Sequence, residues 1–413
     1  MPPLLQDRRI VLGISGGIAA YKGAELVRLL VREGARVNVV LTESARQFVT
    51  ELTLQTLSGN PVATSLFDLD QESKIGHIRL ADEAELLVVA PATADVIARF
   101  AHGLANDLLT TIHLATRAPL LLAPAMNVHM WEHPLTQANL RRLVDTESAR
   151  VVGPADGELA CGYTGAGRMV GPATVLEAIE GCLAKQDLAG ERFLITAGPT
   201  CEPVDAVRAL TNRSSGKMGF AVARAARARG ADVTLVAGPT ALETPLGVER
   251  VDVRTAAQMK VAVLERATAA SAVVMVAAVA DYRPEKAVAG KIRKEKAGEA
   301  LTLRLVRTDD ILATLGRERR AARAATPVLV GFAAEWAPAA RSLGAKLRAK
   351  GCDLLVANDI GEAGSGFDSD TNRVRIVGPD GSEDLARAPK LEIAHQVLDR
   401  VVPLLRRPAT RPR

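Results

Sequence analysis

Residues 211–219 read TNRSSGKMG and bring two serine hydroxyls, a glycine and a lysine together. Such a composition suits a phosphate-binding loop, because hydroxyl groups and the backbone N–H groups beside a glycine donate hydrogen bonds to phosphate oxygens. The Walker pattern, however, needs a glycine five residues before Gly216 and a Ser or Thr after Lys217. This chain has Thr211 and Met218 at those positions, so the segment does not belong to a P-loop NTPase.

More polar groups follow in the same half of the chain, in AVADYRP, KIRKEK and FAAEW. Clustered basic and hydroxyl groups near Asp281 suit a polyphosphate with a divalent metal ion, because the cation neutralises phosphate charge while a lysine stabilises the leaving group. The basic run from Lys291 to Lys296 is equally consistent with a solvated loop. Composition alone leaves this choice open.

In the first half, unusual residues lie where four predicted strands end: GISGGIAAYK at 13–22, LTES at 41–44, APATAD at 90–95 and APAMN at 123–127. Ligands of open parallel sheets bind at the carboxyl ends of the strands. The glycines allow backbone N–H groups to approach a phosphate, and the small residues of APATA and APAMN leave flat space for a ring. The four strand ends together predict a binding pocket.

Two further side chains are candidates for proton transfer. His77, in GHIRLAD, is expected in a loop before a strand, as an acid, a base or a hydrogen-bond partner, with a surface loop histidine as the alternative. Cys161 lies in ELACGYTGAGRM, which is too rich in glycine to be a packed helix or strand. That segment is either a disordered loop or a lid over a site, and a cysteine in a lid can give or take a proton.

The elements that position these groups repeat a single plan. Residues 9–14 predict a buried strand, followed by the glycine turn, a helix and a second strand over VNVVLT. The plan returns with RFLITAGPT at 192–200, a helix over GFAVARAARARGA and the strand DVTLVAG. AELLVVAPATAD also echoes SAVVMVAAVADY, and LLLAPAMN echoes CDLLVANDI. The sequence therefore predicts an α/β protein with two doubly wound, Rossmann-like domains, divided near Asp187 into residues 1–187 and 188–405.

Composition excludes several classes of protein. The 413 residues carry a formal charge of +5, but aromatic residues make up 3% and do not interleave with basic ones, so a nucleic-acid surface is disfavoured. The tail 406–413 is expected to be disordered. The four cysteines have neither metal-ligand nor disulfide-framework spacing, and no apolar run is long enough to span a bilayer, so we expect no membrane partner and a cytoplasmic protein.

Six motifs of the first half resemble, in their order, those of the flavin-dependent cysteine decarboxylases, and in particular the phosphopantothenoylcysteine decarboxylases of coenzyme A synthesis. They are GISGGIAAYK, GHIRL, APATAD, GLANDLL, PAMN and ACGYTGAGRM. The resemblance implies a flavodoxin-like domain that binds FMN, often at a subunit interface in a trimer. It also implies that His77 and Asn127 position the substrate and that Cys161, on the lid, protonates the enethiol left after loss of CO2. The FMN-binding residues implied are Ser15, Gly16, Thr42, Pro91, Ala92, Thr93 and Ala94.

Motifs of the second half resemble those of the phosphopantothenate-cysteine ligases, which bacterial bifunctional enzymes carry behind the decarboxylase. These motifs are TAGPTCEPVDAVRALTNRSSGKMG, AAVADYRPEKAVAGKIRK, GFAAE and LLVANDI. This resemblance implies that CTP activates 4'-phosphopantothenate as an acyl cytidylate, with Mg2+ held in part by Asp281, and that the ligase half dimerises, so that dimers link trimers into a dodecamer. The CTP-binding residues implied are Met275, Val276, Ala277, Asp281, Lys291, Ile311, Phe332, Lys346 and Lys350. Lys291, on a flap, is also a catalytic candidate, as is Asn212. The substrate-binding residues are Arg208, Asn212, Ser214, Ser215 and Gly216.

One departure from the ligase pattern stands beside the nucleotide site. The family commonly has Asn-Pro-Asp-Ile where this chain has Thr308, Asp309, Asp310 and Ile311. The acid at Asp309 either weakens triphosphate binding or helps to hold the metal ion, and the sequence does not choose between them.

Two alternatives were weighed against this interpretation. A two-domain nicotinamide dehydrogenase needs GxGxxG with an acidic residue about 20 positions later, and both glycine loops lack this pattern. A non-catalytic flavoprotein that regulates a partner would have lost His77, Asn127 or Cys161, and this chain has all three.

Overall fold

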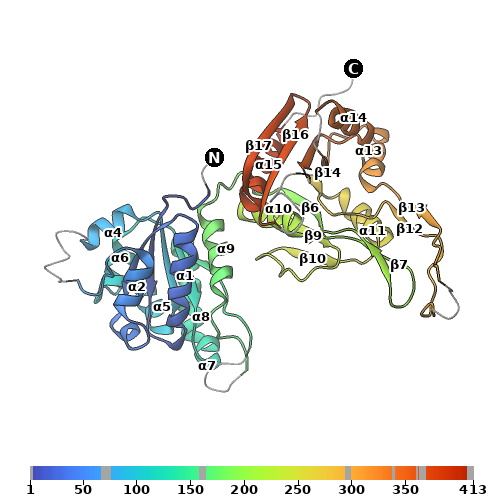
Figure 1. The fold of residues 1–413 in the computed structure, drawn as a ribbon. Helices are drawn as coiled ribbons and strands as arrows, with labels where there is room; N and C mark the ends of the chain where they lie inside the picture. Colours follow the sequence, from blue (N-terminus) through green and yellow to red (C-terminus); the bar gives the residue numbers. More distant parts are fainter. Residues whose placement is uncertain are drawn as a thin grey trace. The chain divides into compact units, whose positions relative to one another are not determined.

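The computed structural model describes residues 3–66, 76–157, 164–293, 299–336, 340–359, 361 and 369–406. The chain divides into two compact units, Met1–Ala184 and Lys185–Arg413, and each is built on its own sheet (Figure 1). The division falls three residues before the boundary expected near Asp187. Asp187 itself pairs with the buried Arg229 of the second unit, with 2.6 Å between Oδ2 and Nη2.

The first unit has a sheet of five parallel strands in the order β2-β1-β3-β4-β5. This order is that of flavodoxin-like doubly wound sheets, in which the topological switch point lies between β1 and β3. The flavodoxin-like fold predicted for this half is confirmed. The strands are β1 (Arg9–Ile14), β2 (Arg36–Leu41), β3 (Leu86–Ala92), β4 (Leu120–Pro124) and β5 (Arg150–Val151).

Helices cover both faces of this sheet, because its strands are apolar on both sides. The side chains of α1, α2 and α9 pack with one face, and those of α4, α5, α6 and α8 pack with the other. The helices are α1 (Tyr21–Arg32), α2 (Glu51–Ser58), α4 (His77–Glu83), α5 (Ala94–Ala101), α6 (Leu108–Ala115), α7 (Val128–Glu132), α8 (Pro134–Glu147) and α9 (Pro172–Leu183), with short 3-10 turns η1 (Ile18–Ala20) and η2 (Glu43–Gln47).

The second unit has a mixed sheet of eight strands in the order β10-β9-β6-β11-β14-β15-β16-β17. The first six are parallel, while β16 and β17 form an antiparallel hairpin at one edge. The strands are β6 (Arg192–Ala197), β9 (Asp232–Ala237), β10 (Glu249–Asp252), β11 (Ala272–Met275), β14 (Val328–Glu335), β15 (Leu354–Asp359), β16 (Thr371–Gly378) and β17 (Gly381–Pro389).

Helices also cover both faces of the second sheet, as a doubly wound fold requires. Helices α10 and α15 pack beside one another on one face, and α11 and α13 pack on the other. Two small hairpins, β7–β8 and β12–β13, follow β6 and β11. These elements are α10 (Lys217–Ala228), α11 (Ala256–Ala267), α13 (Ile311–Ala321), α14 (Ala340–Lys350), α15 (Lys390–Leu405), β7 (Cys201–Pro203), β8 (Ala209–Thr211), β12 (Tyr282–Pro284) and β13 (Leu305–Arg307).

Two expectations about elements are wrong. His77 lies not in a loop before a strand but at the first position of α4, because the apolar Leu80 and Ala81 turn this segment into a helix that packs on the sheet. The echo of LLLAPAMN by CDLLVANDI does not mark equivalent strands either. β4 lies directly beside β3, whereas β15 is separated from β11 by β14, so the positional equivalent of β4 is β14.

Candidate active sites

The first unit contains a cavity of about 560 Å³ at the carboxyl edge of its sheet. Its wall is mainly apolar, as is usual for cofactor and substrate pockets. Gly16, Thr93 and Asn127, three residues predicted for this site, all line it. The remaining lining residues are Gly17, Ile18, Ala19, Tyr21, Lys22, Ala125, Met126, Met130, Gly167, Arg168 and Met169.

Ser15 joins two of the predicted segments although it is buried beneath the cavity. Its hydroxyl donates a hydrogen bond of 2.7 Å to the carbonyl of Pro91 and accepts one of 3.1 Å from the amide of Thr93. The glycine turn after β1 and the APATA turn after β3 are therefore held together. Thr42, from the third predicted segment, accepts from the amide of Ala45 at 3.3 Å and caps η2.

Gly16 lies where a side chain has no room. A Cβ atom there would be 2.3 Å from the Cβ of Ser44 and 2.9 Å from its carbonyl carbon, while a Cβ at the neighbouring Gly17 would meet no atom closer than 3.9 Å. The bare backbone of Gly16 thus forms part of the cavity wall. This close approach is the physical reason for glycine at that position.

Two cations in this cavity were not assigned a role from the sequence, although both lie in quoted motifs. The ammonium of Lys22 donates to the carbonyl of Met169 at 2.6 Å, and burial, with a smaller contribution from Arg168, lowers its pKa. The Arg168 guanidinium lies over Gly157. A Cβ atom built at Gly157 would be 3.5 Å from the Cζ atom of Arg168. The apolar pocket therefore has a positive end.

The glycine-rich segment that carries Cys161 leaves and re-enters the structure at this same place. Cys161 and residues 158–163 lie outside the described residues. On either side of them, Gly157 and Gly165 exchange two backbone hydrogen bonds, of 3.2 and 3.1 Å, and the amide of Ala155 donates to the carbonyl of Arg168 at 2.7 Å. The two ends of the segment are thus anchored beside the cavity.

Asn127 and His77, the other catalytic candidates of this half, are placed differently. Asn127 lines the cavity, and its Oδ1 accepts from the amide of His129 at 2.9 Å, which fixes the side chain at the start of α7. His77 is half-buried and does not line the cavity of its own chain. The structure brings Asn127 and the predicted FMN turns together but not His77.

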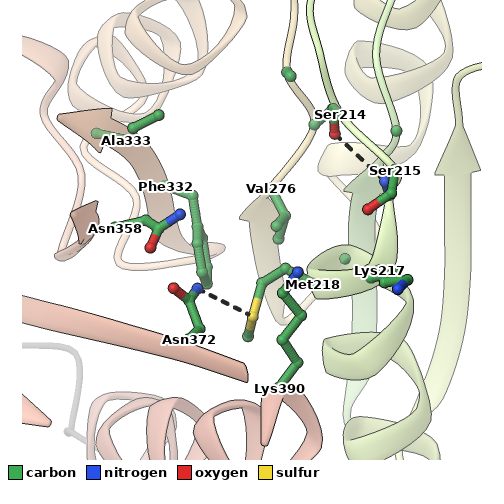
Figure 2. Close-up of a pocket in the computed structure, with 16 residues that line it drawn as sticks. Ser214, Ser215, Lys217, Met218, Val276, Phe332, Ala333, Asn358, Asn372 and Lys390 are labelled. Carbon is green, nitrogen blue, oxygen red and sulfur yellow. Dashed lines mark hydrogen bonds between the residues drawn. The ribbon is translucent and has the colours of Figure 1, made fainter. Parts of the chain in front are cut away.

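The second unit has its own cavity, of about 110 Å³, at the carboxyl ends of β6, β11, β14 and β15. Figure 2 shows its labelled side chains, with Val276 just after β11, Phe332 in the neighbouring strand β14, and Ser214 and Ser215 before α10. Six predicted residues line it: Ser214, Ser215, Gly216, Val276, Ala277 and Phe332. The residues that the sequence did not indicate include Met218, Asn358, Asn372 and Lys390.

Two side chains hold the backbone that forms one wall of this second cavity. The buried hydroxyl of Thr196 accepts from the amides of Val276 and Ala277, both at 3.1 Å. The side-chain Nδ2 of Asn212 donates hydrogen bonds to the backbone carbonyls of Ala278 and Val279, at 3.2 and 3.1 Å. Asn212 is therefore joined to the wall but does not line the cavity, and Thr196 is a supporting residue that the sequence did not reveal.

Asp205 organises Arg208 and the segment that carries Lys291. Its carboxylate accepts from the guanidinium of Arg208 at 2.5 and 3.0 Å and from the amide of Ile292 at 3.0 Å. Arg208 in turn donates to the carbonyl of Ile292 at 2.9 Å. The hydrogen bond from Arg208, followed by that from the amide of Val207, holds the pKa of Asp205 far below its usual range, so the carboxylate stays charged.

Other predicted nucleotide residues do not line this cavity. Met275 and Ile311 are buried in the apolar core, and Asp281 is exposed. Lys346 pairs with Glu335 at 2.7 Å, and Lys350 pairs with Asp310 at 2.5 Å. Both lysines are thus held by acids.

Asp309, the departure from the ligase pattern, pairs with Lys260 at 2.7 Å. This hydrogen bond, followed by the charge of Lys260, lowers the pKa of Asp309. Its negative charge is thereby partly compensated. Within the described part of the chain, no three His, Cys, Asp or Glu side chains gather to hold a metal ion.

Comparison with known proteins extends these observations to the whole chain. Residues 3–184 match the family model described as Flavoprotein, and residues 188–404 match that of the DNA/pantothenate metabolism flavoprotein C-terminal domain. The coenzyme A biosynthesis bifunctional protein CoaBC of Vibrio cholerae is 47% identical over 396 residues, which are 95% of this chain and 98% of the relative. The chain belongs to this family. The CoaBC protein of Escherichia coli is 45% identical, and the match covers 96% of this chain and 97% of that relative. The CoaBC protein of Bacillus subtilis is 43% identical, and the match covers 97% of this chain and 98% of that relative.

Two solved structures are each similar to part of this chain. The C-terminal domain of a CoaBC protein is 39% identical, with a TM-score of 0.45, and covers 54% of this chain and 98% of that domain. A PPC decarboxylase mutant complexed with pantothenoylaminoethenethiol is 34% identical, with a TM-score of 0.38, and covers 42% of this chain and 97% of that chain. The family membership predicted from the motifs is confirmed by the whole-length relatives. Of the helices that the structure describes, none combines the length and apolarity needed to cross a membrane.

The Asp205 contacts give a first testable prediction. The Asp205→Asn variant loses the charge that holds Arg208 and Ile292, and a hydrogen bond to a charged group contributes about 1.5–3 kcal/mol. We expect the amide of Ile292 to exchange its hydrogen at least about tenfold faster, as measured by hydrogen–deuterium exchange of the intact chain. Asp232→Asn, which alters an exposed acid of the same unit, is the control. Unchanged exchange at residue 292 would contradict the role given to Asp205.

Proposed function

We propose that this chain catalyses two consecutive steps of coenzyme A biosynthesis. The second unit joins cysteine to 4'-phosphopantothenate with CTP, and the first unit decarboxylates the resulting phosphopantothenoylcysteine to 4'-phosphopantetheine with FMN. One observation carries the proposal: the similarity to CoaBC proteins runs through both units, and each unit has a cavity at the carboxyl edge of its sheet lined by the motif residues.

The first cavity fits a flavin. Its size is that of a cofactor pocket, its wall is mainly apolar, and Gly16 and Thr93, from the turns after β1 and β3, both line it. The residues proposed to hold FMN are Ser15, Gly16, Thr42, Pro91, Ala92, Thr93 and Ala94. When bound, FMN supplies an electron acceptor for the thiol end of the substrate and returns the electrons after CO2 has left.

The chain's own residues orient the substrate and transfer a proton in this step. Asn127, fixed at the start of α7 and lining the cavity, positions the cysteine end of the substrate. His77 also positions the substrate, and Cys161 donates the proton that the enethiol needs, together with the hydride that reduced FMN would return, to become the thiol product. The anchored ends of the 158–163 segment support its role as a lid, because they return the chain to the cavity at both sides.

Gly16 and Gly17 offer a matched test of the flavin site. A methyl group at Gly16 would meet Ser44 at 2.3 Å, whereas one at Gly17 has room. We expect Gly16→Ala to weaken FMN binding by at least about tenfold, or about 1.4 kcal/mol, while Gly17→Ala changes it by less than about threefold. Flavin fluorescence titration of the purified protein measures both. Equal FMN affinity in the two variants would contradict the placement of FMN against Gly16.

The second cavity is proposed to hold the nucleotide and the activated acid. The carboxylate of 4'-phosphopantothenate attacks the α-phosphorus of CTP, which releases pyrophosphate and gives an acyl cytidylate; the amino group of cysteine then displaces CMP. Ser214, Ser215 and Gly216 donate hydrogen bonds to phosphate at the start of α10, and Val276, Ala277 and Phe332 form the walls. Arg208 and Asn212 are the proposed contacts of the acyl cytidylate.

The remaining ligase residues act around this cavity. Lys291 closes over the intermediate from the segment that Asp205 anchors, while Lys346 and Lys350 exchange their acid partners for nucleotide phosphates. Met275, Ile311 and Asp281 complete the proposed CTP site. Mg2+ commonly binds through one or two carboxylates together with substrate phosphates, so Asp281 needs no preformed cluster of acids to serve as its ligand.

An assay with 4'-phosphopantothenate, cysteine, CTP and Mg2+ tests both reactions. We expect CMP to form only when all three substrates are present, and CO2 to follow from the purified yellow protein. Lys291→Gln should lower CMP formation at least about a hundredfold, since a positioned cation contributes about 2.7–4 kcal/mol to such a transition state. The same variant should decarboxylate added phosphopantothenoylcysteine normally. Clear preference for ATP, or equal loss of both activities, would refute the division into two sites.

The proposed assembly is a homo-oligomer in the cytoplasm, with decarboxylase trimers linked by ligase dimers into a dodecamer. Two observations support a shared decarboxylase site. His77 does not line the cavity of its own chain, and the cavity is rimmed by exposed apolar side chains, with Ile18 61%, Tyr21 58% and Met130 48% exposed. A second copy packed on this rim is proposed to cover it and supply His77.

Mixed oligomers test this assembly. His77→Gln and Cys161→Ser chains should each be inactive as decarboxylases alone, but random co-assembly should restore about one quarter of the sites, because heterologous packing pairs an intact His77 with an intact Cys161. Carbon dioxide release by the co-expressed chains measures this recovery. A chain with both substitutions, mixed with unaltered chains, is the control for subunit exchange. No recovery in well-mixed oligomers would contradict a site shared between copies.

A further inference from the structure

The C-terminal elements of the second unit complete its cavity, although no motif pointed to them. Lys390, the first residue of α15, and Asn372, in β16, both line the cavity. The hairpin pairs Thr371 with Pro389, and the amide of Lys390 donates to the carbonyl of Asp370 at 3.0 Å. The start of β16 and the start of α15 are thus held together at the cavity.

Lys390 brings a buried charge to this place. Its side chain is 7% exposed, and its ammonium donates to the carbonyl of Ser369. Lysine is rarely this buried, because an ammonium group loses hydration that neutral carbonyls replace only in part. Figure 2 shows the Lys390 side chain extending toward Met218, at the start of α10. A lysine in the wall of this cavity offers a positive charge to a phosphate group that enters it.

The start of α10 adds a second set of phosphate donors. This 12-residue helix begins after Gly216, which has a left-handed φ of 82° and provides no side-chain cap. The first N–H groups of a helix lack intrahelical acceptors and carry partial positive charge. Lys217, the first residue of the helix, also lines the cavity. Two lysines and a helix N-terminus therefore meet at one wall.

Asn372 independently points to a ligand. It is 2% exposed, and among the described residues no group donates a hydrogen bond to its Oδ1. Its Nδ2 lies 3.9 Å from the Sδ of Met218, which only accepts hydrogen bonds and so keeps the amide nitrogen on that side. Figure 2 shows the amide nitrogen facing Met218 and the amide oxygen on the opposite side, and Asn372 lines the cavity. A buried acceptor of this kind calls for an N–H or O–H group of a ligand.

Lys217 is engaged by a counter-ion that a ligand can displace. Its ammonium lies 2.7 Å from Oδ1 of Asp370, whose side chain is 89% exposed. Exposed ion pairs contribute about 0–1 kcal/mol, so a phosphate with more charge and a better-buried position competes successfully with this carboxylate. Asp370 also precedes β16 directly, next to the carbonyl that holds Lys390.

We propose that Lys217, the first residue of α10, and Lys390 bind a phosphate group of a ligase substrate together with the N-terminus of α10. Asp370 is the counter-ion that this phosphate displaces, and Asn372 accepts a hydrogen bond from a donor group of the same molecule. The inference rests on the proposed function, which brings two phosphorylated substrates, CTP and 4'-phosphopantothenate, to this cavity. Both offer a phosphate together with N–H and O–H donors, so the shared chemistry is a phosphate ester and the experiment separates the two sources.

Calorimetric binding of CTP and of 4'-phosphopantothenate to the intact chain tests the proposal. Lys390→Met and Lys217→Met should each raise the Kd of the same one of these two ligands at least about tenfold. Asp370→Asn should lower the Kd of that ligand about threefold, because the competing carboxylate is gone. The ligand that responds identifies the phosphate bound here. Lys185→Met and Asp232→Asn, which alter exposed groups outside the cavity, are the matched controls.

The outcomes separate this inference from the proposed function. If the unaltered chain neither binds CTP nor forms CMP, the proposed ligase reaction fails. If it does both, and the lysine variants bind both ligands within about twofold of the unaltered chain, the inference alone is overturned. Should Lys390→Met fail to fold, Lys217→Met and Asp370→Asn decide the matter, because a purely structural ion pair would not make binding tighter when Asp370 is neutralised.

Discussion

The parallel pairing of strands is the constraint on which both sites depend. A chain that enters successive parallel strands from the same edge must leave them all at the other edge, so the turns that follow β1, β3 and β4 gather there, as do those after β6, β11 and β14. The helices that begin in these turns direct their first N–H groups to the same place. Ser15 then joins two of the turns in the first unit, and Thr196 joins the end of β6 to the turn after β11 in the second. This edge of each sheet therefore presents preformed hydrogen-bond donors.

Local sequence patterns were sufficient to predict most of the parallel strands, although β5, β10 and β14 were not among them. The opening strands and their helices lie where the alternation of apolar strand, glycine turn and amphipathic helix predicts them, at β1, α1 and β2 and again at β6, α10 and β9. The wrong pairing of LLLAPAMN with CDLLVANDI has a physical reason, since buried parallel strands share an apolar composition whatever their place in the sheet. The helix at His77 is short, and its apolar face becomes clear only once it packs on the sheet.

The candidate sites were predictable where a turn carries the chemistry and hidden where distant elements meet. Ser214, Gly216 and Phe332 belong to motifs and line the second cavity. Asn372 and Lys390 stand in ordinary strand and helix sequence, and only the antiparallel hairpin brings them to that cavity. Asp205 likewise gains its importance from contacts with Arg208 and Ile292, the latter 87 positions away. Such residues carry no local signal, because their neighbours in space are set by topology.

The order of the elements along the chain has a consequence for synthesis. The first unit ends at Ala184, so its sheet and helices are complete before the second unit has been translated. The second sheet, in contrast, places β6 beside β11 and adds β16, β17 and α15 only at the end. Its cavity wall therefore closes only after α15 has been synthesised. During translation, an emerging chain can already have a folded flavoprotein unit while its ligase unit is still open.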